Sequence, residues 1–210
     1  MTGRVLETGA DIAEGLDWLC AREPAFLSAR AAVAEVPLRR RPEGFAALLW
    51  AIVGQQVSTA SAAAIWARLE AAGLTAEPAV RAAPDEALRA AGLSRPKARY
   101  ASALAAAGLD YPGLAALPEA ELIATLTAVP GIGRWTAEIY AGISLGRADV
   151  LAAGDLALQE AARRLFALPA RPAERELRAM AQDWSPWRGV AARLLWAYYR
   201  VMTGKEGLTR

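Results

Sequence analysis

Histidine is absent from this chain of 210 residues, and cysteine occurs once, as Cys20. Without histidine, neither a Ser-His-Asp triad nor a Cys-His pair can form, and most zinc sites are excluded. A single cysteine cannot close an intramolecular disulfide or supply a four-cysteine iron–sulfur cluster. Acid–base chemistry near neutral pH must therefore use a carboxylate, a tyrosine, a lysine or the one thiol.

Lysine is scarce as well: Lys97 and Lys205 are the only two, so arginine carries nearly all the positive charge of a chain whose net charge is +2. Arginine suits phosphate recognition through its planar fork. A GC-rich genome also favours arginine over lysine, so the charge balance does not establish a nucleic-acid partner. Long apolar runs are missing too, and the N-terminus lacks the layout of a signal peptide. We expect a soluble, cytoplasmic protein with no membrane partner.

Strand patterns are also missing, because apolar residues recur at helical rather than alternating spacing. Hydrophobic residues make up 55% of the chain, enough for a large core, and alanine, leucine and arginine are good helix formers. The sequence predicts an all-α fold of roughly ten helices with short proline- and glycine-containing connections. Gly54 is expected to break the long helical run over 43–73.

One glycine-rich turn interrupts this helical pattern, in the stretch "LTAVPGIGRWTAEIY" (126–140). Gly131 and Gly133 permit close approach by another molecule just before a helix N-terminus, whose free N–H groups favour an anion. Val129 and Ile132 can anchor the turn in the core. Spacing leaves two interpretations open: a phosphate clamp, or a plain helix–turn–helix corner capped by glycine.

The stretch resembles the hairpin of the helix-hairpin-helix DNA glycosylase superfamily, and within it the 3-methyladenine DNA glycosylase II branch of the AlkA/Mag type. Four further segments match this branch in the same order, so the resemblance covers about residues 45–202 and favours the clamp. They are "AIVGQQVSTASAAAIWARL" (51–69), "GLSRPKARYASALA" (92–105), "ADVLAAGDLAL" (148–158) and "WSPWRGVAARLLWAYY" (184–199).

The resemblance implies a single domain over 1–210, built as two helical lobes with the active site in the cleft between them. The expected central lobe covers about 45–165 and contains the hairpin at 126–140. Residues 1–44 and 166–210 are expected to form the second lobe. We expect no N-terminal β domain of the kind found in some relatives, since only residues 1–44 precede the first lobe.

Asp155 stands where the resemblance places the catalytic aspartate, at the start of a helix 22 residues past Gly133. When an N-glycosidic bond breaks, positive charge develops on the sugar, and an ionised carboxylate stabilises it. The carboxylate can also orient the attacking water. Asp155 is equally suited to capping the helix, and both roles are compatible. Asp149 is a rival carboxylate that we expect to brace the loop.

Trp135 occupies the position at which strand-nicking members of the superfamily carry a Schiff-base lysine. The resemblance therefore implies a monofunctional enzyme without lyase activity, in which Trp135 stacks on a flipped base. Trp196 matches a second pocket tryptophan, although it lies in an apolar run that also suits the core. The expected pocket further includes Gln55, Ile139 and Tyr140. Ile139 replaces a tyrosine of relatives.

Gln56 matches the residue that fills the gap left by a flipped base, although a polar break between two helices would look the same. Phosphate contacts are expected from Gly131, Gly133, Arg134, Thr136 and Ser58, and Lys97 is a further candidate. No cofactor is implied. Hairpins of this family often hold a monovalent cation, Na⁺ or K⁺, on main-chain carbonyls, here near Val129 and Ile132, although the sequence itself does not show one.

The implied function is excision of alkylated purines from double-stranded DNA in base excision repair, by a monomer at the bacterial nucleoid. The implied substrates are 3-methyladenine and 7-methylguanine, with ethenoadenine and hypoxanthine as further candidates. Two alternatives stay open: a non-catalytic helix-hairpin-helix DNA-binding module, and a glycosylase of the same fold with another lesion preference. A pure binding module would need the hairpin but neither Asp155 nor an aromatic pocket.

Overall fold

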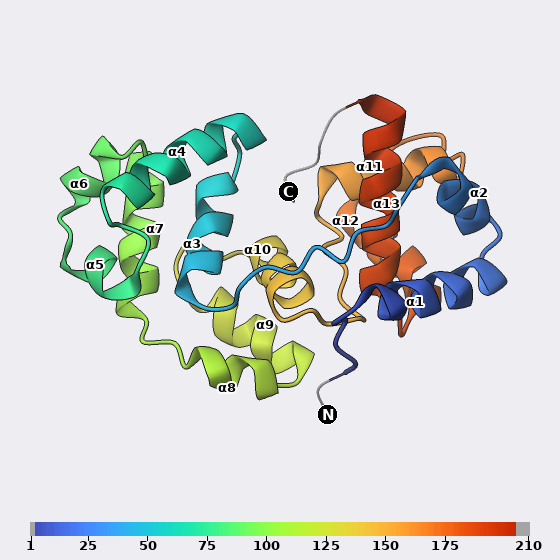
Figure 1. The fold of residues 1–210 in the computed structure, drawn as a ribbon, viewed down its shortest axis with the longest axis horizontal. Coiled ribbons are helices and arrows are strands. Elements are labelled where there is room, and N and C mark those ends of the chain that lie inside the picture. Colours follow the sequence, from blue (N-terminus) through green and yellow to red (C-terminus); the bar gives the residue numbers. More distant parts are fainter. Residues whose placement is uncertain (1–2, 205–210) are drawn as a thin grey trace. The chain divides into compact units, whose positions relative to one another are not determined.

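The structure is a computed structural model that describes residues 3–204. Within this range the regular structure is helical, and the β pairing amounts to one isolated antiparallel bridge between Val5 and Arg147 (Figure 1). The predicted all-α class is confirmed. No helix in the described range is long and apolar enough to cross a lipid bilayer.

Contacts divide the chain into two compact units, and the first covers Arg41–Tyr140. In this unit α7 contacts α3, α5 and α6. Helix α10 packs on α9 and α3 (Figure 1). Leucines of α3, α7 and α9 fill the interior. The helices of this unit are α3 (Phe45–Gly54), α4 (Thr59–Ala71), α5 (Glu77–Ala82), α6 (Asp85–Ala90), α7 (Arg95–Ala106), α8 (Tyr111–Ala116), α9 (Glu119–Thr127) and α10 (Arg134–Ile139).

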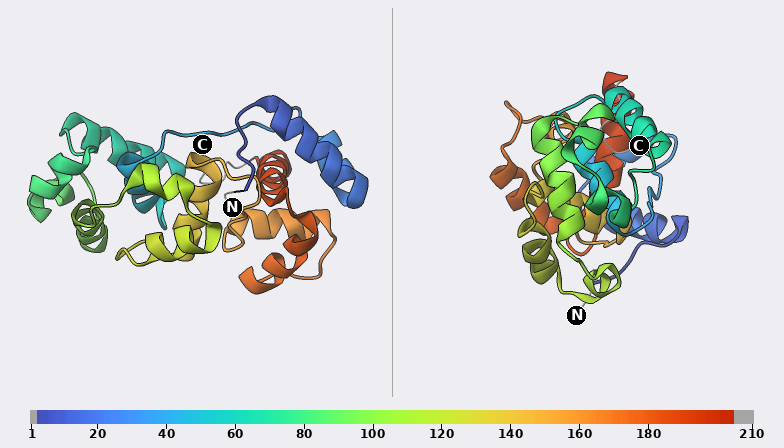
Figure 2. Two further views of the ribbon diagram at one scale, coloured as in Figure 1. Left: turned by 90° about the horizontal axis from the view of Figure 1, so that it is seen from below. Right: turned by 90° about the vertical axis from the view of Figure 1, so that its left-hand side faces the viewer.

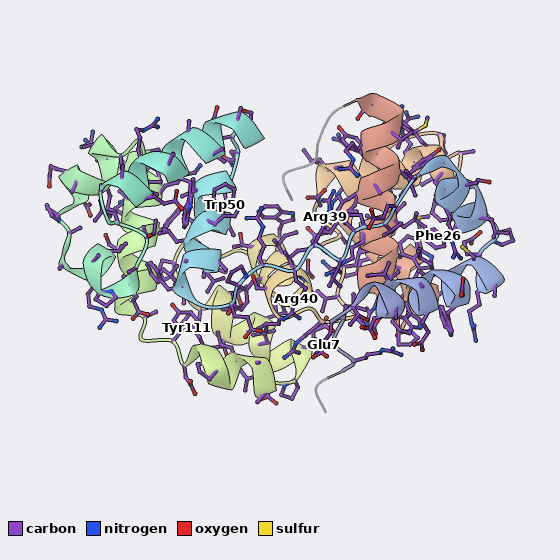
Figure 3. The ribbon with its side chains drawn as sticks, viewed as in Figure 1. Glu7, Phe26, Arg39, Arg40, Trp50 and Tyr111 are labelled. Atoms are coloured by element: carbon purple, nitrogen blue, oxygen red, sulfur yellow. The ribbon has the colours of Figure 1, made fainter. Side chains whose placement is uncertain are left out.

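The second unit consists of Gly3–Arg40 together with 141–204. Helix α13 lies beside α11 and also contacts α1 and α2 (Figures 1 and 2). Phe26 of α2, labelled in Figure 3, packs edge-on against Trp184 and Phe166. Its helices are α1 (Gly9–Arg22), α2 (Ala25–Ala32), α11 (Leu156–Leu165), α12 (Glu174–Met180), the 3-10 turn η2 (Ala181–Trp184) and α13 (Arg188–Thr203).

The boundary between the units differs from the expected one. The sequence-based division assigned 45–165 to one lobe, whereas the structure ends the first unit at Tyr140 and assigns 141–165 to the second. The physical reason is the packing of α11, whose apolar face is buried against α13 and α2. The sequence of a helix alone does not predict which distant helix packs against its apolar face.

Capping residues define several helix ends. Thr8 and Asp11 form a reciprocal capping box at the start of α1. Helix α3 ends at Gly54, so the predicted break is confirmed.

The helix after the hairpin is not regular over its whole length, because α10 changes at Tyr140 into a π-helical turn, η1 (Tyr140–Ser144). Such π turns are rare and recur at functional sites.

Candidate active site and hairpin

The hairpin turn between α9 and α10 is anchored by Val129 and Ile132, which are both buried. The N–H of Ile132 donates to the carbonyl of Val129 at 3.0 Å and closes the turn. Gly131 has a φ of 90°, and a Cβ there would collide with the ring of Tyr100 on α7. Gly133 is the N-cap of α10 with a φ of −83°, and a Cβ there would meet nothing within 4 Å. The two glycines therefore have different roles: Gly131 is required by the fold, and Gly133 leaves the helix start exposed.

Gln55 braces the hairpin from a neighbouring loop. Its side-chain amide donates to the carbonyl of Gly131 at 3.0 Å and to the hydroxyl of Thr136 at 3.2 Å. Thr136 is itself buried, at 2% exposure. Its hydroxyl therefore faces Gln55 within the unit, which does not suit the predicted phosphate contact by that side chain. The side-chain amide of Gln55 is directed at the hairpin, and its predicted role at the pocket stays a prediction.

The wedge loop, residues 55–58 between α3 and α4, presents Gln56 at its tip. Gln56 is exposed and has a φ of 55°, a left-handed conformation that costs a non-glycine residue about 1 kcal/mol or more. Ser58 is the N-cap of α4, and its hydroxyl accepts from the N–H of Ser61 at 3.1 Å. Ser58 is exposed, so a phosphate contact by Ser58 stays a prediction.

Helix α10 carries four of the predicted residues, Arg134, Trp135, Thr136 and Ile139. Arg134 is exposed and forms an ion pair with the buried carboxylate of Glu138, with 2.9 Å between Nε and Oε1. Trp135 and Ile139 are half-buried on the same short helix. Tyr140 is different: it is 2% exposed, and its hydroxyl accepts from the N–H of Gly44 at 3.0 Å. Burial with an occupied hydroxyl makes Tyr140 a support for this unit, and its predicted place in a base pocket stays a prediction.

Asp155 is the N-cap of α11 in the second unit, where it is 5% exposed. Its Oδ1 accepts from the N–H groups of Ala157 at 3.0 Å and Leu158 at 3.1 Å. The capping role is therefore present in the structure. These donors hold the carboxylate in a fixed orientation at the start of α11.

Trp196 of α13 adds a third donor to the same oxygen, with its indole N–H 3.3 Å from Asp155 Oδ1. Trp196 is 4% exposed, so little of its ring is open to solvent. The tryptophan thus contacts the candidate catalytic group directly. The predicted roles of Trp196, as a pocket wall or as a core residue, did not include this hydrogen bond. Its predicted stacking on a base stays a prediction.

Asp149 forms a separate network that ties the loop before Asp155 to α13. Arg188 donates to both of its carboxylate oxygens at 2.8 Å, and the Ser185 hydroxyl donates at 2.7 Å. Burial raises the pKa of Asp149, but these hydrogen bonds outweigh it and leave the pKa below its usual value. Asp149 is thus held as a bracing carboxylate.

Residues 49–186 match the family described as "HhH-GPD superfamily base excision DNA repair protein". The chain belongs to this family.

Individual HhH-GPD proteins extend the comparison. The alkylbase DNA glycosidase-like protein mag2 of Schizosaccharomyces pombe is 32% identical over 116 residues, which cover 53% of this chain and 54% of that protein. DNA-3-methyladenine glycosylase 1 of the same yeast is 31% identical over 167 residues, 74% of this chain and 72% of that protein. The chain thus spans about half the length of the first relative and most of the second.

A solved structure supports the HhH-GPD fold over nearly the whole chain. The 3-methyladenine DNA glycosylase Mag1 of S. pombe, in complex with abasic DNA, superposes with a TM-score of 0.78 at 27% identity. The match covers 89% of this chain and 95% of that one. This similarity includes both units described above.

Two cations of this HhH-GPD chain, the half-buried Lys97 and the buried Arg193, make contacts that the sequence did not predict. Lys97 of α7 donates to the carbonyls of Val53 at 2.8 Å and Gln55 at 2.6 Å. Arg193 of α13 is 1% exposed and donates to the carbonyls of Leu38, Gly142 and Gly189 at 2.7–2.9 Å. Burial, with a smaller effect from nearby arginines, lowers the pKa of Arg193 to about 10. The sequence did not predict these contacts, because the partners are carbonyls far along the chain.

Side chains that could bind a metal ion do not cluster in the described residues. Residues 3–204 contain no cluster of three or more acidic or cysteine side chains that could hold a metal ion. At the hairpin, the carbonyl of Val129 accepts from Ile132 and the carbonyl of Gly131 accepts from Gln55, which leaves each oxygen a second lone pair. Main-chain oxygens of this kind fit a monovalent cation, which stays a prediction.

Proposed function

We propose that this chain is a monofunctional DNA glycosylase that hydrolyses the N-glycosidic bond of alkylated purines in double-stranded DNA. The observation that carries the proposal is the geometry at Asp155, whose Oδ1 accepts three hydrogen bonds, two from the start of α11 and one from Trp196. Family membership and relatives named as 3-methyladenine glycosylases support 3-methyladenine and 7-methylguanine as substrates. Ethenoadenine and hypoxanthine are further candidates.

The proposed chemistry relies on charge rather than on proton transfer to the leaving base. A cationic alkylpurine is already a good leaving group, so a chain without histidine can still expel it. As the bond to the base breaks, the ionised Asp155 stabilises the positive charge that develops on the sugar. The N–H donors fix the carboxylate in place before the reaction begins, so little reorganisation is needed. Asp155 then orients the water that completes hydrolysis.

The proposed DNA contacts are distributed over the hairpin and the wedge loop. The exposed N–H edge at Gly133 and the guanidinium of Arg134 would bind a phosphate, as the complex of Mag1 with abasic DNA makes reasonable for this fold. Gln56 would fill the gap in the stack, and Trp135 would stack on the displaced base. Double-stranded DNA is the proposed partner of a monomer, and in a bacterium that places its action at the nucleoid.

Lyase activity is not part of the proposal. Strand nicking through a Schiff base needs an amine at the sugar. Trp135 stands at the hairpin position of that amine, and the ammonium of Lys97 is bonded to two main-chain carbonyls. Borohydride should therefore trap no enzyme–DNA adduct, and release of strand breaks should require added base. A trapped adduct would refute this part.

The decisive experiment is Asp155→Asn, assayed by base release from methylated duplex DNA. Asparagine caps helices as well as aspartate, so folding should be preserved while excision falls by a factor of about 10² or more. Asp110→Asn is the matched control, since Asp110 is also an N-cap whose side chain accepts from Gly113 at 3.1 Å. That control should excise like the unaltered chain.

The outcomes separate the proposal from its main alternative. Excision by Asp155→Asn at the unaltered rate would refute the catalytic assignment. Absence of base release by the unaltered chain, with DNA binding intact, would instead favour a non-catalytic binding module. Release of a different set of bases from a lesion panel would indicate a glycosylase of another preference.

A further inference from the structure

Lys97 is one of two lysines in the chain, and its ammonium does not lie on an open surface. The Nζ atom donates to Gln55 O at 2.6 Å and to Val53 O at 2.8 Å, the last carbonyls of the segment that ends α3. Carbonyls at a helix C-terminus lack partners within the helix and carry the negative end of its dipole. An ammonium supplies both the missing donors and the opposite charge. Lys97 is half-buried, and this burial lowers its pKa.

The carbonyl of Gln55 belongs to the peptide that joins Gln55 to Gln56. Fixing this peptide plane fixes the direction in which the left-handed Gln56 projects from the loop. The side chain of Gln55 then extends the connection to the hairpin through Gly131 and Thr136. One residue therefore links the ammonium, the loop tip and the hairpin by bonds of 2.6–3.2 Å.

Helix α7 also reaches the hairpin directly. Tyr100 follows Lys97 by three residues, which places both side chains on one face of α7. The Tyr100 ring occupies the space that a side chain at Gly131 would need. A single helix thus contacts the wedge loop with one residue and the hairpin turn with the other.

We propose that Lys97 is a positioning residue for Gln56, and that α7 holds the wedge loop at a fixed distance from the phosphate-binding turn. Lys97 does not bind DNA in this arrangement; it acts through the loop it supports. The inference rests on the proposed glycosylase function, because it assigns Gln56 the role of filling the gap left by the target base. It makes Lys97 a determinant of how efficiently a paired base is displaced.

The first test asks whether Lys97 touches phosphate. Each phosphate contact adds about 0.9 to the slope of log K against log salt, so loss of a contact would lower that slope by about 0.9. Lys97→Met should leave the slope for duplex binding unchanged. A reduction by that amount would overturn the positioning role in favour of a direct phosphate contact.

The second test compares 7-methylguanine opposite cytosine with 7-methylguanine opposite an abasic site in the same duplex. Displacing a paired base costs a few kcal/mol, and the wedge offsets part of this cost. Lys97→Met should therefore slow excision of the paired lesion by about tenfold and of the unpaired lesion by less than about twofold. Lys97→Arg, which keeps a cation on the two carbonyls, should restore much of the difference. A general folding defect would slow both substrates alike, so equal slowing refutes the inference.

A double variant and a charge control complete the design. If Lys97 acts through Gln56, then Lys97→Met should add little to Gln56→Ala, whereas independent roles would give additive losses. Arg99→Met removes an exposed cation from the same helix and should leave the ratio of paired to unpaired excision unchanged. If the unaltered chain excises neither lesion, the proposed function fails. If it excises both and Lys97→Met keeps the same ratio, only this inference fails.

Discussion

The two glycines of the hairpin turn can be separated experimentally, because the structure gives them different surroundings. Replacing Gly131 by alanine puts a side chain at a φ of 90°, which costs about 1–2 kcal/mol for an L-residue. The new Cβ would also overlap the ring of Tyr100, and overpacking of this kind costs about 1–3 kcal/mol. The variant Gly131→Ala should therefore lose about 2–5 kcal/mol of unfolding free energy.

Gly133→Ala is the matched change two residues later. Its φ of −83° is open to alanine, and no atom lies within 4 Å of the added Cβ. Unfolding free energy should change by no more than about 0.5 kcal/mol. The methyl group nevertheless stands at the exposed start of α10, where we propose that a phosphate binds. Affinity for DNA of any sequence should fall by about tenfold, equivalent to about 1.4 kcal/mol.

Thermal unfolding followed by circular dichroism, together with fluorescence anisotropy on an undamaged duplex, gives both readouts. For a chain of this size about 1 kcal/mol corresponds to a Tm change of roughly 2–4 °C, so Gly131→Ala should melt roughly 4–20 °C earlier. An unchanged Tm for Gly131→Ala would refute the steric argument. Unchanged DNA affinity for a stable Gly133→Ala would show that the turn is only a corner between helices. Loss of binding by a Gly131 variant proves nothing about phosphate, because that variant is expected to disturb the turn.

Two further predictions concern the second unit. Trp196→Phe keeps an aromatic ring but removes the N–H donor whose nitrogen lies 3.3 Å from Asp155 Oδ1. The single-turnover excision rate should therefore fall by about tenfold, while affinity for abasic DNA stays the same. An unchanged rate would refute the role of Trp196 as a donor to the carboxylate. Asp149→Asn removes the charge that pairs with Arg188 and should cost about 1–3 kcal/mol of unfolding free energy at neutral pH. Because the folded protein lowers the pKa of Asp149, this contribution is present above about pH 4 and is lost as the pH falls through the folded pKa. Denaturant titrations of both chains between neutral and acidic pH should therefore converge, and a constant difference would contradict the assignment.

Local chemistry made part of the fold predictable from the sequence. The break at Gly54, the hairpin turn and the cap at Asp155 all depend on residues within a few positions of one another. Helices α5, α6 and α8 were not predicted, since six residues are too few to display a helical period. The π turn at 140–144 also has no local signature, because it depends on how its neighbours pack.

The candidate site divides in the same way. Asp155 and Gln56 could be selected by motif, and the structure describes their surroundings without testing their roles. The contacts of Lys97 and Arg193 could not be predicted, because their carbonyl partners lie as far as 44 and 155 residues away in the sequence. Thr136, Tyr140 and Gln55 were predicted at DNA or at the base, but their polar atoms bond within the first unit. Side-chain type identified them as important, and only tertiary packing distinguishes a support from a contact.

The left-handed backbone at Gln56 has a consequence for how this loop evolves. Glycine would adopt the same conformation without strain, so selection for a more stable fold alone would replace the glutamine. A chain that keeps glutamine there accepts about 1 kcal/mol of lost stability at an exposed position. Under the proposed role of Gln56, stability and activity select for different residues at position 56, and an effort to make this protein more thermostable should leave that unfavourable conformation in place.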